Sequence, residues 1–217
     1  MRAAPPKSGP ARVPLALVVG NPRGEVADAE LANGLSRGDE WAIVVAWHRF
    51  APLVQTLAAR ALGSKSDAED LTQEVFVRLL RRAGTLREAE SLRSFVYSIA
   101  VRTLKSELRY RRLRVWLSFR EPETLVDLQH STPDPEARAL LRNFYALLDR
   151  LSPRDRLVFV LRRVEAMTIE EVAAVMGLSP STVKRSLTHA SARLSRWIDG
   201  DPRLCELLDG RFGGRSQ

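Results

Sequence analysis

Apolar residues recur at steps of three and four along most of the chain, and no stretch alternates with the period of two that is typical of strands. The pattern predicts a helix from Asp39 to about Leu62, bent or restarted at Pro52 and ended by a left-handed Gly63. A second helix should open at Ser66 or Asp67, where acidic residues in its first turn suit the helix dipole. The predicted fold class is therefore all-α.

A third long helix is predicted from Ser91 to Arg114, where one apolar stripe contains Leu92, Phe95, Val96, Ile99, Thr103 and Leu104. The periodicity fails between Arg120 and Glu136, where three prolines stand among acidic and polar residues. Helices resume at Ala137 and continue to about Ile198. We therefore expect two small helical domains joined by a flexible linker. The predicted boundaries are 1–28 for a disordered extension, 29–118 for the first domain, 119–136 for the linker, 137–200 for the second domain and 201–217 for a tail.

A pair of helices near the C-terminus has strong start and stop signals. In "MTIEEVAAVMG" the pattern Thr-x-x-Glu, from Thr168 to Glu171, predicts a capping box, and Gly177 can adopt the positive φ that ends the helix. Ser179 and Pro180 then supply the cap and first position of the next helix. A helix-turn-helix is predicted here, because two helices with a tight glycine turn are its signature.

The second helix of this pair is two-sided. Val183, Leu187, Ala190 and Leu194 should face inward, while Ser181, Lys184, Arg185 and Thr188 fall on the opposite side with His189 at its edge. In a helix-turn-helix such a basic face enters the major groove, where its side chains meet phosphates and base edges. The alternative is an ordinary helical hairpin with a solvated basic face.

Composition narrows the choice of partner and compartment. The chain has 217 residues, a formal net charge of +8 and a pI near 10.5, which favour nucleic acid first and an anionic membrane surface second. Its one cysteine, Cys205, allows no internal disulfide and no cysteine-based metal site. No apolar run approaches the ~20 residues needed to cross a bilayer, and "VPLALVV" is not followed by a signal-peptide cleavage site. A cytoplasmic protein is predicted.

The candidate catalytic groups do not form a site. His48, His130 and His189 are scattered, with no metal-ligand spacing to another His, Cys or carboxylate. The stretch "VVGNPRG" lacks the Gly-Lys-Ser/Thr ending of a phosphate-binding loop. We predict no catalytic residue, no metal, no cofactor and no small-molecule substrate, and conclude that the chain is not an enzyme.

Two further stretches carry charge of opposite sign. In "DAEDLTQEVFVRLL", Asp70, Gln73 and Glu74 share one exposed strip, which taken alone is most simply a solvated face. The third helix carries a row of basic residues in which Glu107 is the only acid: Lys105, Arg109, Arg111, Arg112 and Arg114. Four aromatic residues are interleaved nearby: Phe95, Tyr97, Tyr110 and Trp116. Positive charge with aromatic rings suits separated DNA strands, although a place in the apolar stripe favours Phe95 as a core residue.

These stretches closely resemble a known family. The acidic stretch and the third helix, "LRSFVYSIAVRTLKSELRYRRLR", resemble region 2 of the sigma-70 family, specifically the extracytoplasmic-function (ECF) sigma factors of bacterial RNA polymerase. The stretch "LSPRDRLVFVLRRVEAMTIEEVAAVMGLSPSTVKRSLTHASARL" resembles region 4. The resemblance covers roughly residues 30 to 200, with the motifs of both regions in the expected order.

The resemblance implies partners and roles. Asp70, Gln73 and Glu74 would bind the β′ clamp helices of core polymerase, whose β flap would be a second contact. The loop from Arg82 to Glu90 would hold a base flipped out of the −10 element, and the predicted −10 contacts are Arg82, Arg87, Arg102, Lys105, Arg109, Tyr110 and Arg112. The predicted −35 contacts are Ser181 and Thr182 on phosphates, and Lys184, Arg185, Thr188 and His189 in the groove. Many family members carry arginine where His189 stands, and an anti-sigma factor is an expected partner.

Two other functions compete with this interpretation. A stand-alone helix-turn-helix regulator would bind a palindromic site without polymerase. An RNA-modifying enzyme or RNA-binding module would use the basic helix, and an enzyme would also need a catalytic cluster, which the sequence does not offer.

Overall fold

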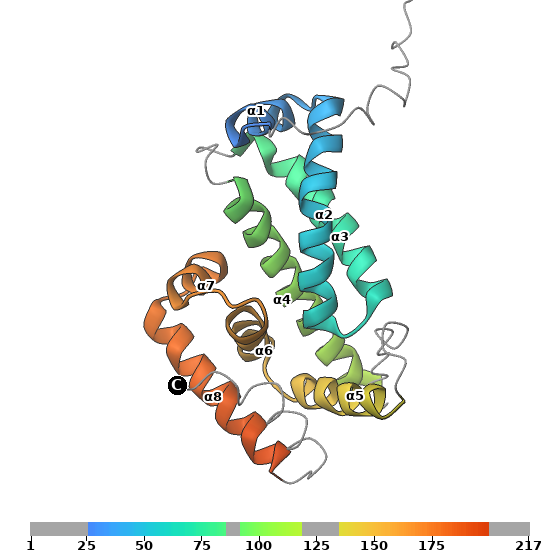
Figure 1. Cartoon of the computed structure of the whole chain (residues 1–217), viewed down its shortest axis with the longest axis vertical. Helices are drawn as coiled ribbons and strands as arrows, with labels where there is room; N and C mark the ends of the chain where they lie inside the picture. The colour runs from blue at the N-terminus through green and yellow to red at the C-terminus, as the bar shows by residue number, and fades with distance from the viewer. Residues whose placement is uncertain (1–25, 86–91, 119–134, 200–217) are drawn as a thin grey trace, which may run out of the picture.

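The computed structural model describes residues 26–85, 92–118 and 135–199, and within these ranges every regular element is a helix (Figure 1). In chain order the elements are α1 (Asp28–Arg37), α2 (Glu40–Leu62), α3 (Lys65–Arg82), the 3₁₀ turn η2 (Ala83–Thr85), α4 (Leu92–Ser118), α5 (Pro135–Asp149), α6 (Pro153–Phe159), the π-helical turn η5 (Val160–Val164), α7 (Ile169–Met176) and α8 (Pro180–Ile198). The all-α prediction is confirmed. The predicted tail, and the predicted linker up to residue 134, lie outside the described residues.

The predicted bounds of α2 are confirmed. The helix runs from Glu40 to Leu62, and Gly63 ends it at φ +75° while its N–H donates to the Ala59 carbonyl at 2.8 Å. The expected restart at Pro52 was wrong, since one helix continues through it. Pro52 lies on an exposed face, so the carbonyl that the ring leaves without a backbone donor can bond to water.

Two helix starts differ from the prediction. α1 was not expected, because ten residues are too few for its two buried leucines, Leu31 and Leu35, to stand out as a period. α3 begins at Lys65 and not at Ser66 or Asp67, because the Ser64 side chain accepts a hydrogen bond from the Asp67 N–H at 3.2 Å. The cap therefore lies two residues earlier than the acidic turn suggested.

The first half of the molecule packs around α2. Its buried face, with Val54 and Leu57, meets Val75 and Leu79 of α3 and Leu104 of α4. By length and composition α2 is also the one described helix that is apolar enough to cross a membrane, although charged and polar residues interrupt its apolar runs. Its contacts with α1, α3 and α4 identify it as the central helix of this half.

The second half has two patches of core, which follow one another along the buried face of α8. Val183, near the start of α8, belongs to the larger apolar cluster with Val172 of α7. Ala190 and Leu194, further along, pack with Leu148 of α5. α8 is therefore held along its length by different neighbours.

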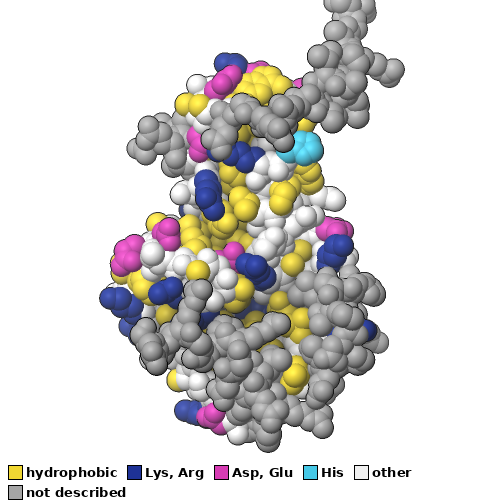
Figure 2. Space-filling view, viewed as in Figure 1, with side chains coloured by type: hydrophobic (Ala, Val, Ile, Leu, Met, Phe, Trp, Pro, Cys, Tyr) yellow, Lys and Arg dark blue, Asp and Glu magenta, His cyan; other side chains and the backbone are white. Residues whose placement is uncertain are grey.

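The two halves of the chain share one continuous hydrophobic core. Leu157 of α6, Leu161 of η5 and Val172 of α7 belong to the same buried cluster as α2 and α4, and α6 and α7 both contact α4. Apolar side chains are visible on the surface where the upper and lower lobes meet (Figure 2). In this structure the halves are docked on each other.

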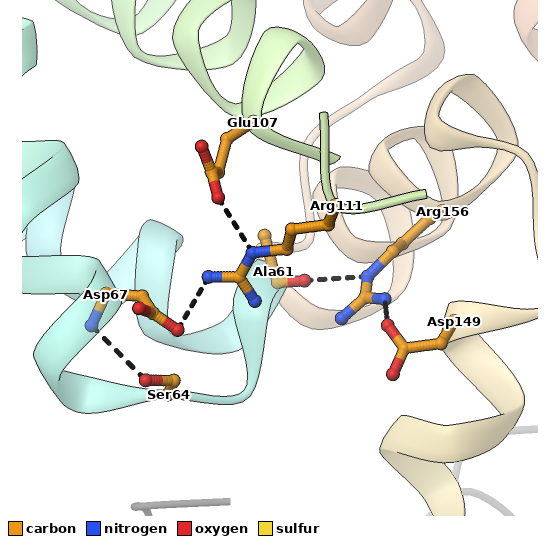
Figure 3. A network of polar contacts seen from close by, with 7 residues as sticks. All are labelled: Ala61, Ser64, Asp67, Glu107, Arg111, Asp149 and Arg156. Carbon is orange, nitrogen blue, oxygen red and sulfur yellow. Dashed lines mark hydrogen bonds and ion pairs between the residues drawn. The ribbon is translucent and has the colours of Figure 1, made fainter. Parts of the chain in front are cut away.

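Polar contacts at the end of α2 accompany this docking. The Arg156 side chain, 3% exposed, donates from Nε to the Ala61 carbonyl at 2.7 Å and pairs with Asp149 (Figure 3). The last carbonyls of a helix lack intrahelical donors, so Arg156 of α6 satisfies one of them from the other half. Burial lowers the pKa of Arg156, and the Asp149 carboxylate opposes that shift. Arg60, near the same helix end, pairs with Glu165 at 2.8 Å.

Candidate nucleic-acid interface

The turn between α7 and α8 has the geometry that the sequence predicts. Thr168 Oγ1 accepts from the Glu171 N–H at 3.2 Å, and Glu171 Oε2 accepts from the Thr168 N–H at 2.7 Å, which completes the capping box. Gly177 ends α7 at φ +64°, and the Leu178 N–H then donates to the Ala173 carbonyl at 2.9 Å. The two helices are thus joined by a short turn with fixed geometry.

The start of α8 is a cluster of hydroxyl groups. Ser179 Oγ accepts from the Thr182 N–H at 3.2 Å, and it lies 3.0 Å from Ser181 Oγ and 2.8 Å from Thr182 Oγ1. The predicted phosphate ligands Ser181 and Thr182 are therefore grouped around the cap. Hydroxyls and N–H groups at a helix N-terminus are suited to an anion such as a phosphate.

The two faces of α8 separate as predicted. Val183 and Ala190 are fully buried and Leu194 is 2% exposed, while Leu187 is half-buried. The exposed side presents Ser181, Lys184, Arg185 and Thr188. This arrangement confirms the predicted exposure of these side chains.

His189 has a partner that sequence reasoning missed. Its Nδ1 lies 3.1 Å from Oδ2 of Asp155, a residue of α6 whose side chain is 4% exposed, while the His189 side chain is 54% exposed. Burial raises the pKa of Asp155, but hydrogen bonds from Ser152 and His189 and the charge of Arg154 outweigh it and hold that pKa below its usual value. In the sequence, Asp155 shows only as an acid in a helix's first turn, so no local signal points to α8.

The acidic strip on α3 is exposed as predicted. Asp70, Gln73 and Glu74 face solvent, opposite the buried Leu71, Val75 and Leu79. Glu74 accepts from Arg78 at 2.7 Å, and Arg78 also donates to Thr103 of α4 at 3.0 Å. Part of the negative charge of the strip is thus balanced within the fold.

The basic row on α4 is divided between two sides of the helix. Arg102, Lys105, Arg109 and Arg112 lie within about 80° of each other around the axis, and all but the half-buried Lys105 are exposed. Arg111 turns toward α3, where it pairs with Asp67 at 2.6 Å as well as with Glu107 at 2.9 Å (Figure 3). Glu107 is therefore not the row's only acidic partner. Phe95 is half-buried against the core, which supports its interpretation as a core residue.

A groove between α3 and α4 has ends of opposite charge. One end is lined by Arg78, Arg81, Arg82 and Arg102, and the other by Asp67, Asp70, Glu74, Glu107 and Tyr110. The ends share Arg78, Thr103 and Ser106. The predicted −10 residues Arg82 and Arg102 thus line the same end of the groove, together with Arg81, which was not predicted. Tyr110, also a predicted −10 residue and 58% exposed, lies at the other end beside the carboxylates. Arg87 lies outside the described residues.

Within the described residues, no group of three or more His, Cys, Asp or Glu side chains is placed to hold a metal ion.

Comparisons with known proteins match both halves of the chain. The family model for sigma-70 region 2 matches residues 46–114, and the model for sigma-70 region 4 matches residues 141–194. The chain is 32% identical to the RNA polymerase sigma factor CnrH of Cupriavidus metallidurans over 190 residues, which cover 82% of this chain and 97% of CnrH. It is 34% identical to the RNA polymerase sigma-E factor of Streptomyces coelicolor over 152 residues, 69% of this chain and 83% of that protein. It is 27% identical to the ECF RNA polymerase sigma factor BldN of the same organism over 178 residues, 80% of this chain and 67% of BldN.

A solved structure agrees with these matches. The structure of CnrH in complex with the cytosolic domain of CnrY superposes with a TM-score of 0.56 at 25% identity, covering 81% of this chain and 99% of the CnrH chain. A stand-alone helix-turn-helix regulator is not favoured, because the relatives are sigma factors and the two matched regions follow in the sigma order. The chain belongs to the sigma-70 family and is an RNA polymerase sigma factor of the ECF type.

Proposed function

We propose that this sigma factor divides its contacts with polymerase and promoter among three surfaces. Asp70, Gln73 and Glu74 bind the β′ clamp helices of core polymerase, the basic side of α4 with Arg82 and Arg87 holds the −10 element, and the exposed side of α8 reads the −35 element. No catalytic group takes part, and the protein acts with polymerase in the cytoplasm. The observation that carries the proposal is that α8, the second helix of a capped helix-turn-helix, has one buried apolar face and one exposed cationic face.

The charge distribution supports different partners for the two ends of the α3–α4 groove. The arginine end, with Arg81, Arg82 and Arg102, suits phosphates of the non-template strand. The acidic end would repel phosphate and suits a basic protein surface. The place of Tyr110 at the acidic end therefore favours a contact with protein over one with DNA, which differs from the role the family resemblance implies.

At the −35 element, Lys184 and Arg185 would donate to base edges or phosphates, and their exposure on the face opposite Val183 supports this role. Ser181 and Thr182 would hold a phosphate at the start of α8, and Thr188 and His189 would reach bases one turn further on. Promoter opening then follows from trapping flipped bases, with the two DNA-binding surfaces raising each other's effective concentration.

An anti-sigma factor is part of the proposal. CnrH, a relative whose structure superposes on this chain, was solved with the cytosolic domain of CnrY. By analogy, a partner of that kind would hold this sigma factor away from core polymerase.

The DNA part of the proposal is tested by transcription in vitro with core polymerase. Lys184→Ala with Arg185→Ala should lower −35 affinity by about 1–3 kcal/mol for each base that is no longer hydrogen-bonded. Arg196→Ala, which removes an exposed arginine from the last turn of α8, is the control and should transcribe normally. Normal initiation by the double variant from every mapped promoter would refute the recognition surface.

The polymerase part is tested by co-elution with core enzyme. Asp70→Arg with Glu74→Arg should abolish association, because reversed charge meets the basic partner surface. Glu30→Arg with Glu40→Arg makes the same change of net charge at two exposed positions on other helices and should bind normally. Equal binding by both variants would remove the strip from the interface.

A further inference from the structure

The contact between His189 and Asp155 links the DNA-facing helix to a helix outside the helix-turn-helix. His189 stands on α8 beside the exposed side chains Arg185 and Thr188, and Asp155 lies in the first turn of α6. The distance from Nδ1 to Oδ2 is 3.1 Å, and α6 and α8 pack directly on each other. One of the two groups is thus buried and the other reaches solvent.

Asp155 is held as a fixed, negatively charged acceptor. Its N–H donates to Ser152 Oγ at 3.1 Å, and its carboxylate lies in the positive field at the start of α6. The polar groups that face it are Ser152 and Arg154 on its own helix and Ser186 and His189 on α8, with Arg154 Nε 3.6 Å from Oδ1. Among the described residues no second carboxylate joins them, and a 4% exposed side chain has little freedom to turn away.

An ionised carboxylate decides which ring nitrogen of His189 remains for a ligand. Because Oδ2 only accepts, the proton between the two groups belongs to Nδ1. Nδ1 is then occupied, and Nε2 is the ring nitrogen that remains for a ligand on a side chain that is 54% exposed. In many histidine sites the hydrogen bond made by one ring nitrogen likewise decides which nitrogen remains for a ligand.

We propose that Asp155 is a positioning residue for −35 recognition, which orients His189 so that Nε2 faces the major groove. Asp155 itself touches no DNA and acts only through the imidazole. The inference rests on the proposed function, since it needs α8 to be the DNA-reading helix. It adds a specificity determinant from α6, outside the family's helix-turn-helix motif.

A double-mutant cycle tests the proposal on the full chain assembled with core polymerase. The affinity for a mapped promoter fragment is measured for the wild type, Asp155→Ala, His189→Ala and the double variant. Asp155→Ala should weaken binding about fivefold when His189 is present and less than about twofold when it is absent, because contacting residues are coupled. Equal losses in both backgrounds would show that Asp155 only supports the fold, and would overturn the inference.

This cycle separates failure of the inference from failure of the proposed function. If His189→Ala has no effect, the inference is overturned, while the variant with Lys184→Ala and Arg185→Ala still tests α8 as the recognition helix. Nitrogen-15 NMR of the full chain gives a second measurement that does not need DNA. The wild type should carry its proton on Nδ1 of His189, and the isosteric Asp155→Asn should lower that population. A wild-type ring protonated only on Nε2 would contradict the proposal.

Discussion

Gly63 offers a direct test of how the two halves of the molecule meet. A Cβ added at Gly63 would lie 2.7 Å from Cδ1 and 2.9 Å from Cγ of Tyr145, whose side chain comes from α5 in the other half. Tyr145 is 6% exposed, and its hydroxyl makes a long hydrogen bond of 3.4 Å to the Ala59 carbonyl. Gly63→Ala must therefore displace a buried ring at the junction.

Gly38 provides a matched control. Gly38 and Gly63 have φ of +76° and +75°, so alanine meets the same left-handed strain at both, about 1–2 kcal/mol. A Cβ at Gly38 meets nothing within 4 Å, whereas the clash at Gly63 adds an overpacking cost of about 1–3 kcal/mol. We expect Gly63→Ala to lower the free energy of unfolding by about 2–5 kcal/mol and Gly38→Ala by about 1–2 kcal/mol.

Urea denaturation followed by circular dichroism measures both changes. In a Tyr145→Ala background, Gly63→Ala should lower the free energy of unfolding only as much as Gly38→Ala does, because the ring that would clash with the new Cβ has been removed. If the two glycine variants lose the same stability within about 0.5 kcal/mol, Tyr145 is not seated on Gly63 in solution and the docked arrangement is wrong.

Three further predictions concern polar groups. Arg156→Met should cost about 2–4 kcal/mol, because it leaves the buried Ala61 carbonyl without its donor and removes the ion pair with Asp149, while Arg163→Met on the exposed side should change little; calorimetry decides. The pKa of Asp155 is lowered by folding, so this group stabilises the protein above about pH 4 and less as the pH falls further; stability measured in acid should depend less on pH in Asp155→Asn. Thr168→Ala should cost about 1 kcal/mol through loss of the capping box, and an unchanged unfolding midpoint would contradict this.

Local chemistry made much of the fold predictable. The bounds of α2, the capping box at Thr168 and the left-handed Gly177 all follow from interactions within one turn of chain, and the structure has them where the sequence placed them. The two faces of α8 were predictable for the same reason, since a helix turns about 100° per residue whatever it packs against. The start of α3 was misplaced because Ser64 and Ser66 are both possible caps, and the choice depends on backbone geometry.

What the sequence alone determined is where the longer helices and the helix-turn-helix form, which of their faces are apolar and which faces carry charge, because these depend on residues three or four positions apart. Only the tertiary structure decided which distant groups meet. Asp67 was predicted only as an acid in the first turn of a helix, and the fold pairs it with Arg111 of α4. Asp155 had no predicted role, and the fold brings it to His189 of α8. Arg156 stands in the polar stretch "RDR", yet α6 places its side chain at the end of α2, where it donates to the Ala61 carbonyl. A charged side chain can be satisfied by any partner that packing delivers, and packing depends on contacts tens of residues apart, which periodicity does not record.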